Sequence, residues 1–341
     1  MSPFEWRDLY VKRFDIDADC RIATAGSCFA QHIGDRLRRS GFNYLDFEAP
    51  PPSLPAARHA DFGYGLFSAR YGNIYTARQL LQLYREAFGK FQPAERIWKK
   101  DGRVHDPYRP GIEPEGFSND EELQTLRRFV HLPAVRDVFT KSDVFVFTLG
   151  LTEAWVSKLD GAVFPTCPGT VAGRFDEAVH EFHNFGFAEI HADMVALIAA
   201  ARKVNPTLKF LLTVSPVPLT ATASDQHVLV ATTYSKSVLR AVAGALYEQY
   251  DFVDYFPSYE IVTASAMRGA LYRPDLRTVT ADGVDQVMKH FFAQHPPPAP
   301  LPAGAPGPAA SASDEAARDF QRELGEFRAV CDDEKLDPVR P

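Results

Sequence analysis

The sequence is poor in the features that mark several large classes of protein. It has four cysteines among 341 residues, none at CxxC spacing, which argues against a zinc knuckle, a redox motif or a disulfide framework. It has no run of about 18 apolar residues, so we expect no membrane span. The opening residues, MSPFEWRDLYVKRF, are charged and do not resemble a secretory signal. Together with the scarce cysteine, this predicts a cytoplasmic protein.

Motifs for metals, nucleotides and polyanions are also missing. There is no HExxH pair for zinc and no glycine-rich phosphate loop, so we expect neither a metal nor a cofactor. The formal net charge is −7, and charges of both signs are spread along the chain. Because no basic field is present, the sequence does not favour a nucleic-acid partner or an anionic membrane. It does not indicate an oligomeric state.

The hydrophobic pattern predicts alternating strands and helices. Buried strands are expected at 21–25, 143–149, 208–214 and 252–255, with a further short strand at 42–47. Amphipathic helices are expected at 76–90, 185–204, 232–249 and 281–294. This alternation indicates an α/β fold with a parallel sheet wrapped on both faces. In such sheets ligands bind beyond the carboxyl ends of the strands, where Ser27, Gly150 and Ser215 would lie.

The remaining segments predict one domain with additions. Residues 1–295 form the domain, and 91–135 are interpreted as an irregular insertion with one helix near 119–129. Residues 157–183 are expected to form a long loop. Residues 296–312 are a Pro/Ala-rich linker, and 313–341 are expected to form a C-terminal helix and tail.

Ser27 is the strongest candidate for a nucleophile. It follows a predicted strand and precedes Phe29, Ile33 and Leu37 at helical spacing, so it lies at a strand-to-helix turn. The positive end of the helix dipole favours a developing oxyanion there. The alternative is that Ser27 caps the helix, as serines often do. Cys28 is a rival nucleophile, since a helix N-terminus activates thiols.

Several motifs give the chain a family resemblance. Gly26-Ser27-Cys28-Phe29-Ala30 resembles the motif that names the GSCFA-domain family, a bacterial group related to the SGNH hydrolases. The resemblance continues through TLGLTEAW at 148–155, TVSPVPL at 213–219, YSKS at 234–237 and YFPSYE at 255–260. It implies a flavodoxin-like three-layer α/β/α sandwich. It also implies a serine esterase-type site that cleaves or transfers acyl groups on carbohydrates.

The resemblance also suggests which residues form the site. The glycine block maps onto Gly72, with Gly63 and Gly65 nearby, and the position of the usual asparagine is taken by Thr152. The backbone amides of Ser27 and Gly72, with the Thr152 hydroxyl, would then hold the oxyanion. The usual Asp and His, three residues apart, map onto Asp275 and Thr278. A second alignment, at 282–285, also lacks the histidine.

Without that histidine another group must accept the serine proton, because a serine hydroxyl is a weak nucleophile without a base. Glu153 and His183 are the main candidates, and His32, His227 and His290 are weaker ones. The alternatives are that Glu153 is a buried structural carboxylate and that His183 is a helix-capping or surface histidine. Tyr234, Lys236 and Arg240 are expected to form a solvated helix face, and the alternative is that they hold an anionic group of a substrate or cofactor.

Two functions follow. One is a serine-dependent esterase or O-acyltransferase that acts on a small-molecule or glycan ester, such as one carried by a carbohydrate or glycolipid. The alternative is a catalytically degenerate binding protein that keeps the SGNH-like fold.

Overall fold

A four-stranded parallel sheet lies at the centre of the computed structural model, which describes residues 6–298. The strand order is β1-β4-β8-β9, and every neighbouring pair is parallel. The strands are β1 (Ile22–Gly26), β4 (Val144–Leu149), β8 (Lys209–Val214) and β9 (Val253–Tyr255). All four strands were predicted within one residue at each end. The predicted linker and C-terminal helix lie outside the described residues, apart from 296–298.

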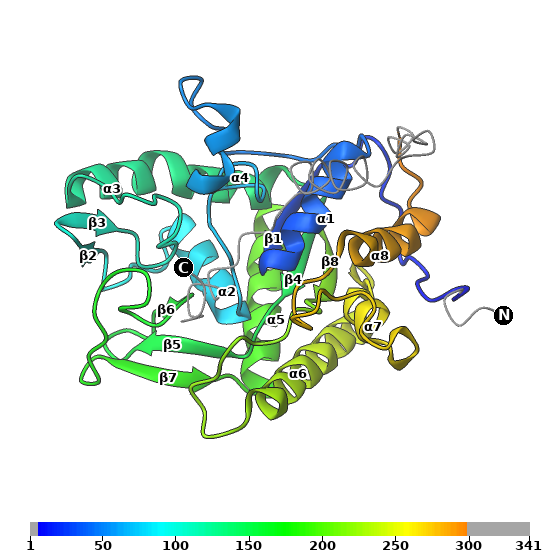
Figure 1. The fold of residues 1–341 in the computed structure, drawn as a ribbon. Coiled ribbons are helices and arrows are strands. Elements are labelled where there is room, and N and C mark those ends of the chain that lie inside the picture. Colours follow the sequence, from blue (N-terminus) through cyan, green and yellow to red (C-terminus); the bar gives the residue numbers. More distant parts are fainter. Residues whose placement is uncertain (1–5, 299–341) are drawn as a thin grey trace, which may run out of the picture.

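Helices cover both faces of this sheet, so the fold is a three-layer α/β/α sandwich (Figure 1). One face is covered by α2 (Ala77–Ala87), α4 (Leu132–Lys141), α5 (Phe187–Val204) and α6 (Val228–Gln249). The other face is covered by α1 (Cys28–Arg39), α7 (Ser258–Thr263) and α8 (Ala281–Gln294). Within the described part of the chain, no helix has both the length and the apolar character needed to cross a membrane.

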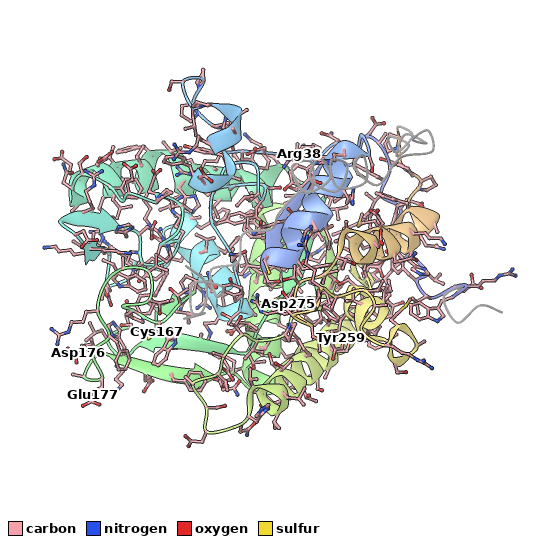
Figure 2. All side chains as sticks on the ribbon, viewed as in Figure 1. Arg38, Cys167, Asp176, Glu177, Tyr259 and Asp275 are labelled. Atoms are coloured by element: carbon pink, nitrogen blue, oxygen red, sulfur yellow. The ribbon has the colours of Figure 1, made fainter. Side chains whose placement is uncertain are left out.

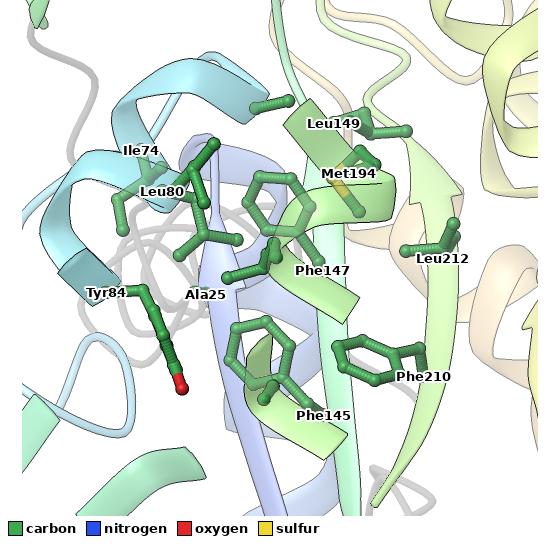
Figure 3. Close-up of a cluster of buried hydrophobic side chains, with 14 of the residues drawn as sticks. Ala25, Ile74, Leu80, Tyr84, Phe145, Phe147, Leu149, Met194, Phe210 and Leu212 are labelled. Carbon is green, nitrogen blue, oxygen red and sulfur yellow. The ribbon is translucent and has the colours of Figure 1, made fainter. Parts of the chain in front are cut away.

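Alternation along the strands divides the core between the two faces. Phe145, Phe147 and Leu149 of β4 pack into the larger cluster with α2, α5 and α6 (Figure 3). Val144 and Val146 point to the opposite face and pack with α1 and α8. Because successive strand side chains point to opposite sides, a strand with apolar residues on both faces, such as β4 apart from Thr148, is suited to this buried position.

The segment predicted as a strand at 42–47 is only a single bridge. Tyr44 pairs in parallel with Ile22, and the Ile22 amide donates to the Asn43 carbonyl oxygen at 2.9 Å. This short pairing still places the segment beside β1, on the side opposite β4. The chain therefore leaves β1 toward one side and later returns on the other. This reversal makes the carboxyl end of β1, where Ser27 lies, a topological switch point of the sheet. Ligands of α/β sheets bind at such switch points.

The predicted loop at 157–183 was wrong in part, because it contains strands of a second sheet. β5 (Glu153–Ser157) pairs antiparallel with β6 (Val163–Phe164) and with β7 (His180–Asn184). Figure 1 shows this sheet to one side of the central sheet.

The insertion is more regular than predicted. It contains the hairpin β2 (Trp98–Lys100) and β3 (Arg103–His105), and α3 (Asp120–Leu126). A π-helical turn (Arg127–His131) continues α3 into α4. The sequence predicted only the helix near 119–129.

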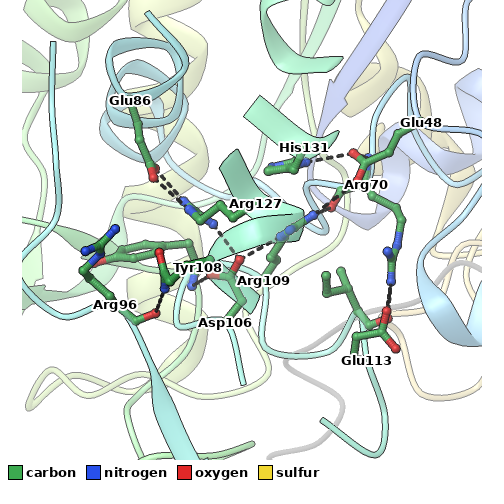
Figure 4. Close-up of polar contacts among 12 residues, drawn as sticks. Glu48, Arg70, Glu86, Arg96, Asp106, Tyr108, Arg109, Glu113, Arg127 and His131 are labelled. Atoms are coloured by element: carbon green, nitrogen blue, oxygen red, sulfur yellow. Dashed lines mark hydrogen bonds and ion pairs between the residues drawn. The ribbon is translucent and has the colours of Figure 1, made fainter. Parts of the chain in front are cut away.

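Buried ion pairs attach this insertion to the core (Figure 4). Arg127 contacts Asp106 at 2.6 Å through Nη1 and Glu86 of α2 at 2.7 Å through Nε. Arg109 contacts the same Asp106 oxygen at 2.8 Å. Burial by itself would raise the pKa of the Asp106 carboxyl. The two guanidinium groups outweigh this effect and hold the pKa well below its usual value.

Candidate active site around Ser27

The turn between β1 and α1 is shaped so that only glycine fits before Ser27. Gly26 has a φ of +142°, and a Cβ added there would lie 2.5 Å from the Thr148 carbonyl oxygen. The Gly26 carbonyl accepts a hydrogen bond from the Ile74 amide at 2.8 Å. The β1–α1 turn is therefore held between the end of β4 and the loop that precedes α2.

Ser27 occupies the N-cap position of α1 but does not cap the helix. Its backbone is extended, with φ −72° and ψ 177°, and its side chain makes no capping hydrogen bond. The side chain is buried, at 3% exposure, and Oγ has no partner among the described residues. The geometry thus contradicts the helix-cap interpretation. A buried hydroxyl without a partner is costly, which points to a role other than stabilising the helix.

A second glycine turn lies against Ser27. A Cβ added to Gly150, just after β4, would lie 2.9 Å from Ser27 Cβ. The amides of Gly150 and Leu151 both donate to the Tyr75 carbonyl oxygen, at 3.1 and 2.9 Å. The turn from Gly150 to Thr152 is therefore fixed beside Ser27.

Two buried threonine hydroxyls belong to the segments around Ser27. Thr152 is completely buried, and its amide donates to Ser235 Oγ of α6 at 3.1 Å. Thr148 pairs in register with Gly26. Neither threonine Oγ1 has a hydrogen-bond partner among the described residues. Sequence reasoning singled out Thr152 but missed Thr148, although its place two residues before Gly150 is visible in the motif.

One expected oxyanion donor is engaged elsewhere. The Ser27 amide donates to the Thr148 carbonyl oxygen at 3.2 Å, as part of the β1–β4 pairing. Gly72 has a φ of +67°, and a Cβ added there would lie 3.5 Å from Arg109 Cβ. It lies two residues before Ile74, whose amide binds the β1–α1 turn.

A pair of buried amide side chains, which the sequence did not reveal, borders the same turn. Gln31 of α1 donates through Nε2 to Asn73 Oδ1 at 3.0 Å. Both side chains are at least nine-tenths buried. They link the first turns of α1 to the Gly72 loop, so the loop and Ser27 are held by one set of contacts.

Glu153 begins β5 and is directed at another loop. Thr222 Oγ1 donates to Glu153 Oε1 at 2.7 Å. Burial raises the pKa of the Glu153 carboxyl, although the Thr222 hydroxyl and the Ala223 amide oppose this. A raised pKa suits a general base that works near neutral pH, but the hydrogen bond observed is to Thr222, not to Ser27.

The histidines considered as bases also contact residues other than Ser27. His183 Nε2 contacts Glu189 Oε1 at 2.9 Å, near the start of α5. His227 caps α6 by accepting the Leu229 amide at 3.2 Å, and His290 stacks on Trp6. Burial, with the nearby Arg36, lowers the pKa of His32 to about 4. No histidine is seen as a partner of Ser27 Oγ among the described residues.

Asp275 and Thr278 form a closed pair in the loop before α8. Thr278 donates to Asp275 Oδ2 at 2.6 Å through its hydroxyl, and its amide donates to Oδ1 at 2.9 Å. Partial burial by itself would raise the pKa of the Asp275 carboxyl. These hydrogen bonds outweigh this effect and bring the pKa below its usual value. The nearby Tyr272 hydroxyl donates to the Pro216 carbonyl at 2.7 Å, just beyond β8. The loop thus lies at the carboxyl edge of the central sheet, and Figure 2 shows Asp275 far from Cys167 and Asp176.

The described residues contain no group of three or more His, Cys, Asp or Glu side chains arranged to hold a metal ion. Cys28, the rival nucleophile, is buried beside Ser27 and forms no disulfide. The β1–α1 turn and the end of β4 with the turn that follows it thus provide three hydroxyls without a partner among the described residues, those of Ser27, Thr148 and Thr152. The glycines of these turns, Gly26 and Gly150, fit tightly against their neighbours.

Comparison with known proteins gives one strong match. The family model described as the GSCFA family matches residues 21–291, which is most of the chain. No curated protein matches the sequence.

The similar solved structures are distant. An acetyl esterase mutant with an acetate ion is 11% identical, covers 81% of this chain and 95% of its own, and has a TM-score of 0.35. A carbohydrate esterase family 3 protein from Talaromyces cellulolyticus has the same values. A putative GDSL-like lipase from Parabacteroides merdae is 12% identical, covers 82% and 97%, and has a TM-score of 0.34.

Proposed function

Because the chain belongs to the GSCFA family, we propose that it is a serine-dependent acyl-ester enzyme, an esterase or an O-acyltransferase, with Ser27 as nucleophile. A base takes the Ser27 proton as Oγ attacks the ester carbonyl carbon. The bond between the acyl carbon and the ester oxygen then breaks, the alcohol leaves with that proton, and an acyl-serine forms. Water or a sugar hydroxyl then accepts the acyl group and frees Ser27. The substrate is a small-molecule or glycan ester, carried by a carbohydrate or a glycolipid.

The observation that carries this proposal is the state of the Ser27 side chain. A serine at an N-cap ordinarily uses its hydroxyl to bind the helix amides. Ser27 does not, although it is buried. The glycines on both sides leave no room for a Cβ, so the segments approach Ser27 as closely as backbone allows. A structural serine requires none of these features.

The remaining roles fall to the residues around it. Thr152 and the Gly72 loop would donate hydrogen bonds to the oxyanion, as their place beside the β1–α1 turn suggests. Glu153, whose pKa is raised by burial, would take the serine proton after its side chain leaves Thr222. His183 would serve as base only by leaving Glu189. Asp275, held by Thr278, has no histidine to orient and would provide negative charge at the rim.

A second function is favoured by the loop before α8, which carries Asp275 and Thr278. Thr278 stands where the resemblance places a histidine, and its hydroxyl closes on Asp275 rather than leaving the carboxylate open. A protein that bound a glycan ester without turning it over would tolerate this arrangement. The alternative is therefore a catalytically degenerate binding protein of the same fold.

A fluorophosphonate probe distinguishes the two functions. The probe reacts with an activated serine, so we expect labelling of the wild-type protein and none of Ser27→Ala. Turnover of 4-nitrophenyl acetate should be lost in the same variant. Mass spectrometry of the labelled peptide would identify the residue that carries the probe.

Cys28→Ala is the matched control, because Cys28 is the adjacent and also buried nucleophile. Turnover of 4-nitrophenyl acetate that persists in Ser27→Ala but disappears in Cys28→Ala would move the proposal to the thiol. A wild-type protein that binds an acetylated oligosaccharide in calorimetry, but neither labels nor turns over, would support the degenerate binding protein instead.

A further inference from the structure

Lys236 is the one lysine among the described residues whose side chain is completely buried, at 1% exposure. It was expected on a solvated helix face, and that prediction was wrong. Its Nζ donates a hydrogen bond to the Gly150 carbonyl oxygen at 2.8 Å. The neighbouring Ser235 accepts the Thr152 amide at 3.1 Å. Two consecutive residues of α6 thus hold the turn that lies against Ser27.

Packing alone does not account for a lysine at this position. Removing an ammonium group from water is costly, and an uncharged side chain of similar length, such as methionine, would fill the same space without that cost. Lys236 lies on the inward face of α6 with Leu239 and Ala243, both fully buried. A charge kept on an otherwise apolar stripe indicates a role that requires the charge.

Gly150 connects this charge to Ser27. One side of the residue approaches Ser27, since an added Cβ would lie 2.9 Å from Ser27 Cβ. Its carbonyl oxygen is bound by Lys236. Only one glycine residue therefore separates the Lys236 ammonium from the serine. The burial of both side chains excludes water, so the field of the ammonium is weakly screened.

We propose that Lys236 is the positioning residue of the Ser27 site, acting through the Gly150–Thr152 turn and by its buried positive charge. This inference rests on the proposed function. By holding the Gly150 carbonyl, Lys236 fixes the turn against the nucleophile. Its charge favours the negative charge that develops when Ser27 loses its proton and attacks a carbonyl, which is the form of catalysis that preorganised charges provide. In a chain without the usual histidine, only a weak base is present to take the Ser27 proton. This cation lowers the barrier to the proton transfer and the attack.

Substitution of Lys236 separates charge from packing. In Lys236→Met we expect fluorophosphonate labelling of Ser27, and kcat for 4-nitrophenyl acetate, to fall about tenfold or more, with KM little changed. Lys236→Arg keeps the charge and should recover part of the rate. The pH–rate profile of Lys236→Met should move to higher pH, because losing a nearby cation makes the serine proton harder to remove. Lys203→Met, at an exposed position in α5, is the control and should match the wild type.

The outcomes distinguish this inference from the proposed function. If wild-type protein labels at Ser27 and Lys236→Met labels at the same rate and with the same pH profile, the positioning role is wrong while the proposed function stands. If wild-type protein does not label at all, the proposed function fails and this inference fails with it. Should Lys236→Met not fold, Lys236→Gln supplies the same comparison, since its amide keeps a donor but no charge. A shift in melting temperature with an unchanged pH profile would show a structural role only.

Discussion

Gly26 matters to both the site and the fold, because it directly precedes Ser27 and lies against the backbone of Thr148 in β4. We predict that Gly26→Ala lowers the free energy of unfolding by about 3 kcal/mol or more, because the new methyl meets the Thr148 backbone and the φ of +142° strains any residue with a Cβ. Urea denaturation followed by circular dichroism measures the loss.

Gly161→Ala is the matched control for this substitution. Gly161 also has a positive φ, +73°, but a Cβ there would meet no atom within 4 Å. Its loss of stability should be about 1 kcal/mol, the cost of the backbone strain alone. Equal losses in the two variants would show that contact with Thr148 contributes nothing.

Single residues also show what a sequence reveals about a site. Ser27 was placed correctly because a strand pattern, a glycine and a helix pattern meet at one point. Lys236 was misplaced because it was grouped with Tyr234, which is 44% exposed, although two positions along a helix point to nearly opposite faces. Its spacing of three and seven residues from Leu239 and Ala243 was the signal for burial. The sequence aligned Asp275 and Thr278 with the usual Asp and His positions, but it did not predict the hydrogen bond between them.

Among the elements, the insertion depends on buried charge rather than on a large core. Its own apolar cluster is small and contains Val104, Ile112, Phe117 and Leu123. Arg127, in the π-helical turn, joins Asp106 of the insertion to Glu86 of α2. A buried ion pair adds little stability over apolar packing, but removing one partner leaves the others uncompensated.

Arg127→Met should therefore destabilise the protein by about 3 kcal/mol, because the partly buried Glu86 would lose its guanidinium partner and the buried Asp106 would keep only Arg109. Thermal unfolding monitored by circular dichroism measures this loss. Arg128→Met changes the next residue, whose side chain is exposed, and should cost less than about 0.5 kcal/mol. Similar melting temperatures for the two variants would contradict the importance of the buried network.

The elements that the sequence predicted well are those with strong periodicity and full burial. β4 is apolar apart from Thr148, β8 is apolar apart from Lys209 and Thr213, and α8 begins and ends at the predicted residues. The second sheet was missed because β6 has two residues and β7, HEFHN, is polar at most positions. Its strands are defined by pairing with β5, a contact between distant segments that local pattern does not encode.

At the scale of the whole molecule, the N-terminal segment is fastened to the end of α8 and to β9. The Tyr10 hydroxyl donates to Asp254 Oδ2 at 2.8 Å and lies 3.0 Å from His295 Nε2. The Ile16 amide donates to His295 Nδ1 at 3.2 Å. Because Nδ1 accepts a hydrogen bond, the proton is on Nε2, which donates to the tyrosine oxygen. The arrangement therefore requires a neutral imidazole.

This requirement makes the stability of the molecule depend on pH. Burial, with the nearby Lys12, lowers the pKa of His295 to about 4, from 6.5 in an unfolded chain. Between these values the unfolded chain binds a proton that the folded protein does not. The His295 contribution is thus complete above the unfolded pKa and is lost as the pH falls, at up to about 1.4 kcal/mol per pH unit. Urea denaturation between about pH 7 and about pH 4.5 should show this slope reduced in His295→Asn and retained in His227→Asn, at an exposed histidine. A slope that is the same in His295→Asn and the wild type would place the pH sensitivity in other groups, and the fastening of the N-terminal segment would then be independent of the histidine charge.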